Sequence, residues 1–461
     1  MVMVKTLNQQ GLETLADASG YLEGLINHER RPGFAYARLD LQPIRALLDR
    51  LGRPEESLSV IHIAGSKGKG STCLFTEAIL LALGERVGTF TSPHLESWVE
   101  RFRIDAEPID EERLVSAVRR VRPIVEELRS GPTETLPSFF DATTAVAFLL
   151  FAEASVDRAL IEVGLGGRLD STNVVQPAVT CITSIELEHT DKLGETEAEI
   201  AGEKAGILKP DRPVVLGSLR PDAARVIRAR AHRIGARVLA RGEDFSLLAS
   251  TDRSGLNAFV FQETESPGAG APLEIQATLA VPGEAAIGNA GLAIACVRAL
   301  DVHSDAALHK AARDGLGQCE LPARIEVLAH DPQVIVDAAH TAESARTLAD
   351  ALKTLAADGF ELILSVSSDK NLYALLDALL PATRRVWVTQ ADSTRSMDAE
   401  LLAKSVLERA PTLAVEVVAD PEEAARRARA ALPAGSHLCA AGSIYLAGIV
   451  RRVLGRRPTA E

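Results

Sequence analysis

Short runs of apolar, mostly β-branched residues alternate with longer segments of helical periodicity in the first half of the chain. The strand candidates are "SVIHIAG" (59–65), "RVGTFTS" (86–92), "RALIEVG" (158–164), "AVTCITSI" (178–185) and "RPVVLGS" (212–218). Strands that are apolar on both sides are typical of parallel sheets covered by helices on both faces. The pattern therefore predicts an N-terminal α/β domain with a mostly parallel sheet.

The pattern changes between about Arg241 and Pro282, where alternating strands are separated by the turn signals "STDRSG" and "ESPGAGAP". We expect a small antiparallel appendage there. After "LGQCELPARIEV" a second series begins, with strand candidates "QVIVDAAH", "LILSVSS", "RVWVTQ", "AVEVVAD" and "SHLCAAGS". It predicts a C-terminal Rossmann-like α/β domain. The junction is placed near Gly317 to Arg324, which gives domains of residues 1–318 and 319–461.

Length and charge narrow the classes of function. A chain of 461 residues exceeds what one hydrophobic core normally organises, so two domains are expected. The formal net charge of -13 argues against a broad nucleic-acid-binding surface, although a local basic cleft for small anions is compatible with it. Small molecules are therefore the expected partners, and a monomer is the expected state.

Cysteine usage and hydropathy indicate the compartment. The cysteines stand singly, at Cys73, Cys181, Cys296, Cys319 and Cys439, which suits a reducing compartment and favours neither a disulfide framework nor a zinc site. The N-terminus lacks the apolar core of a signal peptide, and the longest apolar run, around Thr143 to Phe151, is too short to span a bilayer. We expect a cytoplasmic protein without a membrane role.

The stretch "VIHIAGSKGKGST" (60–72) runs from an apolar strand into a glycine-rich turn and then into a helix expected to begin near Thr72. Gly65, Gly68 and Gly70 would let backbone N–H groups close around phosphate oxygens, and Lys69 would add a positive charge. The usual phosphate-loop expression fails here, since Ile63 replaces its first glycine and Gly70 replaces the hydroxyl residue after the lysine. A tight glycine turn without a ligand is the alternative interpretation.

Further polar residues fall at strand ends, where ligands gather in open α/β sheets. Glu162 is embedded in an apolar strand, which is expensive unless the carboxylate is paired or binds a metal. Ser92 and His189 follow two other strands, and Lys204 lies on the helical stretch "AGEKAGILKP". Each residue taken singly has a structural alternative, namely a salt bridge, a turn cap or a solvated helix position. Together with the loop they indicate a site for a metal and a nucleotide.

A series of motifs in this order resembles one family. The motifs are "GSKGKGST", "TSPHLESWVERFRID", "SFFDATT", "IEVGLGGRLDSTN", "ITSIELEHTDKLGETEAEIAGEKAGILKP", "LPARIEV", "VDAAHT" and "GSIYLAG". The chain is similar to the Mur ligase superfamily, specifically to the folylpolyglutamate synthases and bifunctional dihydrofolate synthases. The resemblance extends from Tyr21 to Gly448. In that family the loop lysine is followed by glycine, so both departures from the usual phosphate-loop expression are the family's own pattern.

The resemblance implies ATP and Mg²⁺, with two ions in the site. It assigns the ATP phosphates to Ser66, Lys67, Gly68, Lys69, Gly70 and Ser71, and the metal to Ser92, Glu162 and His189. Lys69 is implied to be catalytic. So is Lys204, which matches a lysine that the family carbamoylates and would thereby become an anion that helps to hold an ion.

The resemblance also assigns residues to the second domain and to the acceptor. Arg324, Asp337 and His340 are implied to reach ATP when the domains close, with His340 catalytic, and Asn289 is implied to lie against the nucleotide. The pterin-bearing acceptor is expected near Ser138, Phe139, Phe140, Asp141, Leu169, Asp170 and Ser171. The family more often has glutamate at the position of Asp141 and asparagine at that of Thr341. It often has a His-Gln or His-Asn pair where Ile287-Gly288-Asn289 stands, and all these departures concern substrate specificity.

The implied reaction is ATP-dependent addition of L-glutamate to a folate, with dihydropteroate as an alternative acceptor. The acceptor carboxylate attacks the γ-phosphate, an acyl phosphate forms, and an amine attacks it, so positioning and charge neutralisation suffice. The base that deprotonates the amine is left open between His340 and Asp337. A Mur-type ligase acting on a cell-wall precursor or a cyanophycin-like substrate shares this mechanism. A phosphate-loop NTPase and a non-enzymatic nucleotide-responsive protein are further alternatives.

Overall fold

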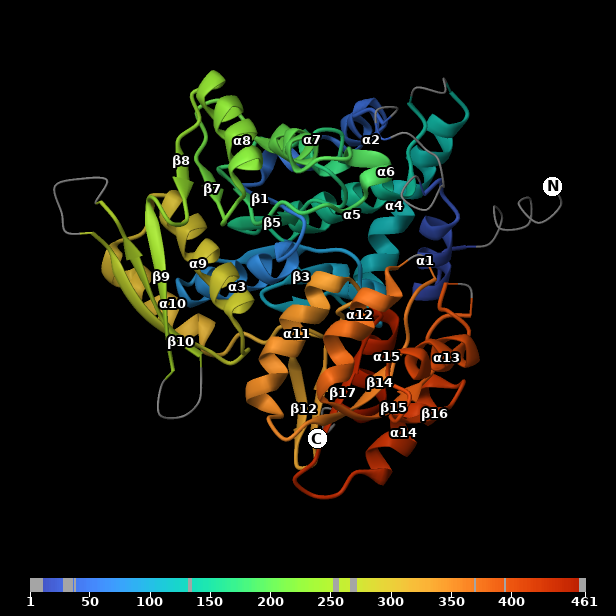
Figure 1. Ribbon diagram of the computed structural model, residues 1–461. Coiled ribbons are helices and arrows are strands. Elements are labelled where there is room, and N and C mark those ends of the chain that lie inside the picture. The colour runs from blue at the N-terminus through green and yellow to red at the C-terminus, as the bar shows by residue number, and fades with distance from the viewer. Residues whose placement is uncertain are drawn as a thin grey trace. The chain divides into compact units, whose positions relative to one another are not determined.

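The computed structural model (Figure 1) describes residues 11–27, 36, 39–131, 135–251, 257–265, 272–368, 370–393 and 395–455. The chain divides into two compact units. The first comprises residues up to His94, Trp98–Leu279 and Ala286–Cys319, and the second comprises Leu95–Ser97, Ala280–Ala285 and the chain from Glu320 onward. The first unit contains two sheets and the second unit one, and the two units have separate hydrophobic cores.

The first unit is built on an eight-stranded sheet in the order β4-β3-β2-β5-β1-β6-β7-β8. Its parallel strands are β1 (Val60–Ala64), β2 (Val87–Phe90), β5 (Arg158–Glu162), β6 (Val179–Ile182), β7 (Val214–Leu216) and β8 (Val238–Ala240). Antiparallel β3 (Phe102–Ile104) and β4 (Glu107–Pro108) extend one edge. Every residue of β1 is buried, as the continuous apolar run predicts for a central strand.

Helices pack on this sheet in groups. One core joins strands β1, β2 and β5 to α1 (Leu15–Glu23), α2 (Gln42–Leu51), α4 (Glu111–Arg129) and α5 (Phe139–Glu153). Another joins β6 and β7 to α7 (Glu197–Lys204) and α8 (Pro221–Arg233). The remaining helices of the unit are α3 (Lys69–Ala82), α6 (Thr190–Leu193), α9 (Glu284–Ala299) and α10 (Asp305–Leu316), and α10 packs on α3.

Short 3-10 turns connect several of these elements. In the first unit they are η2 (Pro54–Ser57), η3 (Trp98–Arg101), η5 (Ser171–Val174) and η6 (Ala205–Ile207), and in the second η7 (Leu380–Ala382). Within the described residues, no helix is both long enough and apolar enough to cross a membrane. The turns η5 and η6 carry or adjoin several of the predicted site residues.

The predicted antiparallel appendage is confirmed. It is a three-stranded sheet in the order β11-β10-β9, formed by β9 (Phe245–Thr251), β10 (Asn257–Glu263) and β11 (Glu274–Leu279). Phe245 and Phe261 stack across two of its strands with ring centroids 5.1 Å apart. Helix α10 packs on β11, so the sheet shares the unit that carries the glycine-rich loop.

The second unit is a three-layer α/β/α domain, which confirms the predicted Rossmann-like class. Its six-stranded sheet has the order β12-β13-β17-β14-β15-β16. The strands are β12 (Glu326–His330), β13 (Gln333–Val336), β14 (Phe360–Leu364), β15 (Thr383–Val388), β16 (Ala414–Val417) and β17 (His437–Ala441). Alternate residues serve opposite cores: Ile335, Leu362 and Cys439 pack in the core of α11–α13, whereas Val334, Ile363 and Leu438 pack in that of α14 and α15.

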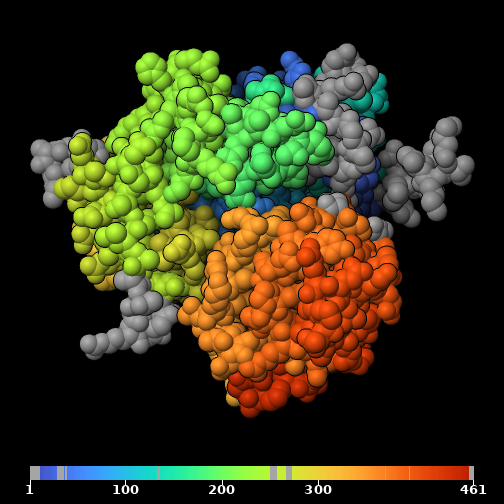
Figure 2. Space-filling model, viewed as in Figure 1, coloured from blue at the N-terminus to red at the C-terminus, as the bar shows by residue number. Residues whose placement is uncertain are grey.

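The helices of this unit are α11 (Ala342–Leu355), α12 (Leu372–Leu379), α13 (Ala399–Arg409), α14 (Pro421–Ala431) and α15 (Ile444–Leu454). In Figure 2 the unit forms one continuous body, coloured orange to red. Strand β12 was missed by the sequence pattern, as were β3, β4 and β8. Three of these are edge strands and β3 is only three residues long, so the runs of buried residues that signal central strands do not arise in them.

Candidate active site

The glycine-rich loop joins β1 to α3, and the helix begins three residues earlier than we predicted. Gly68 is the N-cap of α3 in the left-handed conformation, with φ +81°, and the helix starts at Lys69 instead of near Thr72. The reason is that a left-handed glycine turns the chain directly into the helix. Lys69, Gly70 and Ser71 therefore form the first turn, whose N–H groups have no intrahelical acceptor and can bind an anion.

Residues that follow β6 hold the loop. The Ser66 and Lys67 amides donate to the backbone oxygen and the Oγ of Ser184, both at 2.9 Å. Thr183 donates its hydroxyl to the Lys67 carbonyl. The Lys69 ammonium donates to the Gly65 carbonyl at 3.0 Å, so it lies over the loop from which its helix starts. Sequence reasoning had missed Thr183 and Ser184, although both stand at a strand end in "CITSI".

Two glycines of the loop leave no room for a side chain. A Cβ at Gly65 would lie 1.9 Å from Thr183 Oγ1, and a Cβ at Gly68 would lie 2.3 Å from Asn289 Oδ1. Asn289, on α9, therefore lies directly against the loop. The structure thus brings together two segments that are more than two hundred residues apart in sequence.

Replacing Gly68 with alanine is expected to destabilise the protein and to weaken nucleotide binding. The left-handed φ alone costs about 1–2 kcal/mol for a non-glycine residue, and the contact with Asn289 adds to that. Gly84→Ala is the matched control, because Gly84 has φ +83° but nothing within 4 Å of the position that a Cβ would take. Thermal unfolding and ATP titration of both variants measure the difference. Equal losses in the two would show that the Asn289 contact is unimportant.

Two predicted metal ligands lie beside the loop. Glu162 ends β5, is 5% exposed, and accepts a hydrogen bond from the Ser92 backbone amide at 2.9 Å. A Cβ on Gly70 would lie 3.5 Å from Glu162 Oε2, so this carboxylate faces the first turn of α3. The adjacency of strands β5, β1 and β2 in the sheet places Ser92, Glu162 and the loop at one edge.

Lys204 is buried at the end of α7 and also reaches the loop. Its ammonium donates to the Gly65 carbonyl at 3.0 Å and to Glu188 Oε1 at 3.1 Å, and its side chain is 3% exposed. Burial, reinforced by the neighbouring Lys69, lowers the pKa of Lys204 to about 8 against the opposing effect of Glu188. A neutral amine is therefore accessible near physiological pH.

Glu188 is a site residue that sequence reasoning missed, although it directly precedes His189. Its carboxylate also lies 3.7 Å from the Lys67 ammonium. Burial raises the pKa of Glu188, but the lysines at positions 204, 69 and 67 outweigh it, so the net pKa is lowered and the group is an anion. His189 caps α6 with φ +48°, and burial lowers its pKa, which favours the neutral form that binds metals.

The donor set suits Mg²⁺ held jointly with a nucleotide. Among the described residues no group of three or more His, Cys, Asp or Glu side chains is placed to hold a metal ion. Mg²⁺ is usually bound by one or two carboxylates together with waters and substrate phosphates, not by an all-protein cage. The Ser92–Glu162 pair beside an anion-binding helix end fits that arrangement.

The predicted acceptor residues form a second cluster in the same unit. Ser138 caps α5, and its Oγ donates to Asp141 Oδ2 at 2.6 Å. Ser171 donates to Asp141 Oδ1 at 2.7 Å, which ties η5 to the start of α5. Asp141 and Ser171 are buried, so they hold the two segments together as well as being candidates for substrate contact.

Aromatic residues surround this cluster. The Phe139 ring is buried and packs edge-on against Trp98, with centroids 5.7 Å apart, and the Arg101 guanidinium lies 4.7 Å from the Trp98 centroid. Phe140 fills the space under Gly164, where a Cβ would lie 2.5 Å from its ring. Trp98 and Arg101 were not singled out from sequence, although both stand in the motif "TSPHLESWVERF".

The loop that contains Leu169 is tied down by a buried tyrosine. The Leu169 and Gly167 amides donate to the Tyr36 hydroxyl at 3.0 and 3.2 Å. Burial raises the pKa of Tyr36, so the phenol remains protonated. Tyr36 was also missed, since nothing in its local sequence connects it to a loop about 130 residues away.

In the second unit, the predicted nucleotide residues lie together at the end of β13. Asp337 is 7% exposed and accepts from the Ile325 and Ala339 amides at 2.8 and 2.7 Å. Burial raises the pKa of Asp337 despite the opposing charge of Arg324. The ring of His340 contacts the Ala338 carbonyl through Nδ1 at 2.8 Å.

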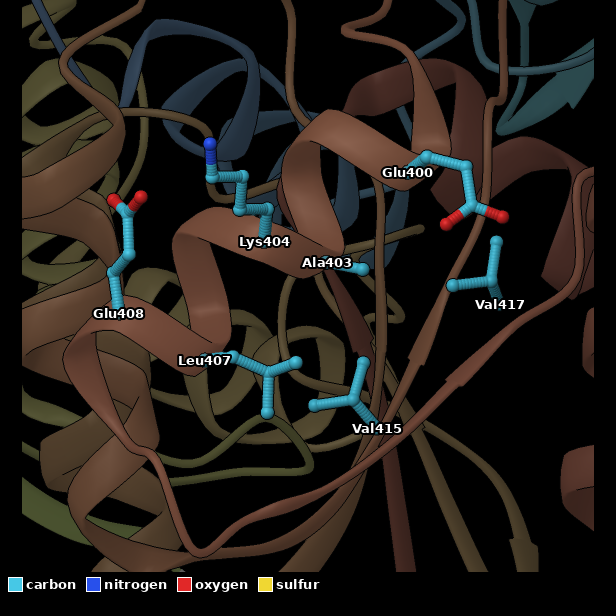
Figure 3. Close-up of a pocket in the computed structure, with 7 residues that line it drawn as sticks. All are labelled: Glu400, Ala403, Lys404, Leu407, Glu408, Val415 and Val417. Atoms are coloured by element: carbon cyan, nitrogen blue, oxygen red, sulfur yellow. The ribbon is translucent and has the colours of Figure 1, made fainter.

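A surface hollow of about 460 Å³ lies elsewhere on the second unit, between α13 and the edge strand β16. Figure 3 shows Leu407 and Val415 directed into it, with Glu400 beside Val417. None of the predicted site residues lines this hollow. It therefore does not enter the assignment of the active site.

Comparison with known proteins agrees with this geometry. Residues 323–444 match the family model described as Mur ligase, glutamate ligase domain. The chain is 35% identical over 460 residues to a dihydrofolate synthase/folylpolyglutamate synthase of Mycobacterium tuberculosis, covering 91% of this chain and 90% of that one.

Solved structures agree as well. The folylpolyglutamate synthase of M. tuberculosis complexed with ADP has a TM-score of 0.84 and 34% identity, over 96% of this chain and 99% of that one. A bifunctional folylpolyglutamate synthase/dihydrofolate synthase with Mn, AMPPNP and L-glutamate bound has a TM-score of 0.78 and 30% identity, over 96% of this chain and 99% of that one. These similarities extend over both units, not over the glycine-rich loop alone.

Proposed function

The chain belongs to the folylpolyglutamate synthase/dihydrofolate synthase family of Mur ligases, and from that premise we propose that it is an ATP-dependent ligase that adds L-glutamate to a folate. Dihydropteroate is a second acceptor. The observation that carries the proposal is the convergence of Lys69, Glu162 and Lys204 on one glycine-rich loop. A phosphate-loop NTPase has no need of the buried Lys204 or of a second α/β domain.

The first step activates the acceptor. Its carboxylate oxygen attacks the γ-phosphorus of ATP, and the bond between that phosphorus and the β,γ-bridging oxygen breaks. ADP departs, and the acceptor has become an acyl phosphate. The loop amides bind the phosphates and Lys69 neutralises their charge. Ser92, Glu162 and His189 are the proposed ligands of Mg²⁺, which when bound neutralises further charge on the phosphates.

The second step forms the amide. The glutamate nitrogen attacks the acyl carbon, the bond to the phosphate oxygen breaks, and inorganic phosphate and a proton are released. His340 is proposed as a catalytic residue, with Asp337 as the other candidate base and Arg324 as a phosphate ligand. The second unit holds all three near the end of β13. Two ions and a carbamoylated Lys204 complete the proposed site, and a monomer is the proposed working form.

The acceptor is proposed to lie against the start of α5 and the loop before η5, where Ser138, Asp141 and Ser171 are linked. Phe139, Phe140, Leu169 and Asp170 complete that set. An aromatic ring near this cluster suits a flat pterin. Asp141, where the family more often has glutamate, shortens this side chain by one methylene and is the first position at which acceptor preference would differ.

An assay of ADP release with alternative carboxylate acceptors tests the proposal. We expect turnover with tetrahydrofolate plus L-glutamate, and with dihydropteroate plus L-glutamate, and none with a muramyl peptide plus its amino acid. Mass spectrometry should show a product heavier by one glutamyl residue. Turnover with the muramyl peptide alone would favour the cell-wall ligase, and ADP release without any acceptor would favour an NTPase.

A further inference from the structure

A histidine lies in the middle of the central strand of the first unit. His62 is fully buried on β1, between Ile161 and Thr180 of the neighbouring strands. Its Nε2 lies 2.8 Å from Thr172 Oγ1. Its Nδ1 is buried and has no hydrogen-bond partner among the residues that the structure describes. No step of the proposed reaction uses this ring.

The directions of the hydrogen bonds follow from the chemistry of the partners. The Thr172 hydroxyl donates to Asp170 Oδ1, and a hydroxyl has only one proton to donate. Thr172 Oγ1 must therefore accept from His62, so the imidazole carries its proton on Nε2. Burial, reinforced by the charge of Lys209, lowers the pKa of His62 to about 3, so the ring is neutral in working conditions. Nδ1 is then a bare acceptor.

Burying a histidine at this position costs free energy of folding unless its ring N–H group donates a hydrogen bond. The flanking residues Ile61 and Ile63 are fully buried and apolar, and an apolar residue at position 62 would leave no unpartnered nitrogen. The donated hydrogen bond leads to Asp170, whose other oxygen accepts from the Leu165 amide at 2.9 Å. Asp170 thus joins the beginning and the end of the loop 165–171.

We propose that His62 is a positioning residue that fixes the loop 165–171 through Thr172 and Asp170 and thereby shapes the binding site of the pterin end of the acceptor. The inference rests on the proposed function, because only that function gives the loop its ligand. The same strand runs from His62 into Gly65. The relay therefore ties the acceptor loop to the strand that also positions the phosphate-binding loop.

Matched variants test the role. Leucine at position 62 removes the donor, whereas glutamine can place an N–H near the position of Nε2. We expect His62→Leu to raise the KM for dihydropteroate by about ten-fold, the effect of one lost hydrogen bond, with the KM for ATP almost unchanged. In His62→Gln the KM for dihydropteroate should return most of the way to the parental value. An unchanged KM in His62→Leu, or equal impairment in both variants, would overturn the proposal.

Thr172 provides a second pair that avoids the central strand. Thr172→Ser keeps the hydroxyl and should behave as the parent, whereas Thr172→Val breaks the relay and should raise the same KM. This pair decides the question if His62→Leu does not fold. A Thr172→Val enzyme with parental KM values would show that the relay does not position the loop.

Nitrogen NMR of the full chain labelled at histidine gives a readout independent of activity. The signals that are missing in His62→Gln belong to the His62 ring. They should show a protonated Nε2 and an unprotonated Nδ1. Unlike the signals of an ordinary histidine, they should not shift between about pH 5.5 and 9. A protonated Nδ1 or a titrating ring would sink the relay even in an active enzyme. Absence of ligase activity in the parent, with the NMR result as expected, would instead sink the proposed function.

Discussion

Replacing Lys204 with alanine is expected to lower kcat of glutamate ligation by about 10²–10³-fold, the range for removing one preorganised electrostatic group from an active site. The fold should persist, because Lys204 lies at the end of α7 and not within its apolar core. The loss follows from its position: the side chain is 3% exposed and contacts both the Gly65 carbonyl and Glu188. Steady-state kinetics with saturating Mg²⁺-ATP measure it.

The large effect is expected because Lys204 is proposed to act as a carbamate. An ammonium close to Mg²⁺ would oppose ion binding, whereas a carbamate supplies oxygen ligands. Carbamate formation needs the neutral amine. With a pKa of about 8, half of the Lys204 side chains are neutral at pH 8, whereas less than about 1% of ordinary lysine side chains are neutral at that pH. Enzyme depleted of CO2 should therefore regain activity on addition of bicarbonate.

Three variants complete this test. Acetate should restore part of the activity of Lys204→Ala, and Lys204→Arg should remain inactive because a guanidinium cannot form a carbamate. Lys209→Ala is the matched control, since burial also lowers the pKa of Lys209 to about 8, while its ammonium donates to the Asn173 carbonyl and not to the glycine-rich loop. It should keep the bicarbonate dependence. A fully active Lys204→Arg enzyme would refute the carbamate and favour direct contact of an ammonium with phosphate.

The same lysine makes stability depend on pH. Its pKa is lower in the folded protein than the ordinary value of 10.5, so the unfolded chain binds more protons between about pH 8 and that value. The penalty for burying the ammonium is fully present below pH 8 and is relieved as the pH rises through this window. Thermal unfolding of the apoprotein should show this contribution, and Lys204→Ala should lack it.

Replacing Glu162 with glutamine is expected to weaken Mg²⁺ activation by at least about 10–100-fold, which is the range for losing a residue that only orients a metal ligand. Glutamine keeps the shape and can still accept the Ser92 amide through its carbonyl oxygen, but it loses the charge and has an NH2 donor in place of the second oxygen. The observable is the Mg²⁺ concentration for half-maximal ADP release, followed by kcat at saturating Mg²⁺. The Mg²⁺ concentration for half-maximal ADP release should rise, and kcat should fall.

Glu77→Gln is the matched control for this prediction. Glu77 is buried to 2% exposure in the same unit, on α3, but pairs with Arg103 at 3.2 Å. Loss of its charge should affect stability without changing the Mg²⁺ requirement. An equal shift of the Mg²⁺ requirement in both variants, or none in Glu162→Gln, would contradict the assignment of Glu162 as a metal ligand.

The sequence by itself determined the architecture and the chemical class. Mostly apolar runs such as "VIHIA" are typical of strands that are covered on both faces of a parallel sheet, and the motif order from the glycine-rich loop to "GSIYLAG" indicates the ligase family. Local signals also singled out Ser92, Glu162 and Lys204 as candidate site residues, because charged or hydroxylic residues at strand ends and in apolar surroundings are expensive without a partner or a ligand.

Only the tertiary structure decided which distant residues meet. Glu188 against Lys204, Asn289 against Gly68, Tyr36 against Leu169 and His62 against Thr172 are contacts across long sequence separations. Periodicity shows only which face of a helix or strand is buried, whereas the order of the strands in the sheet decides which strand ends lie at the same edge. The start of α3 at Lys69 was missed because glycine adopts left-handed and right-handed conformations about equally readily, so the local sequence does not show that Gly68 is a left-handed N-cap.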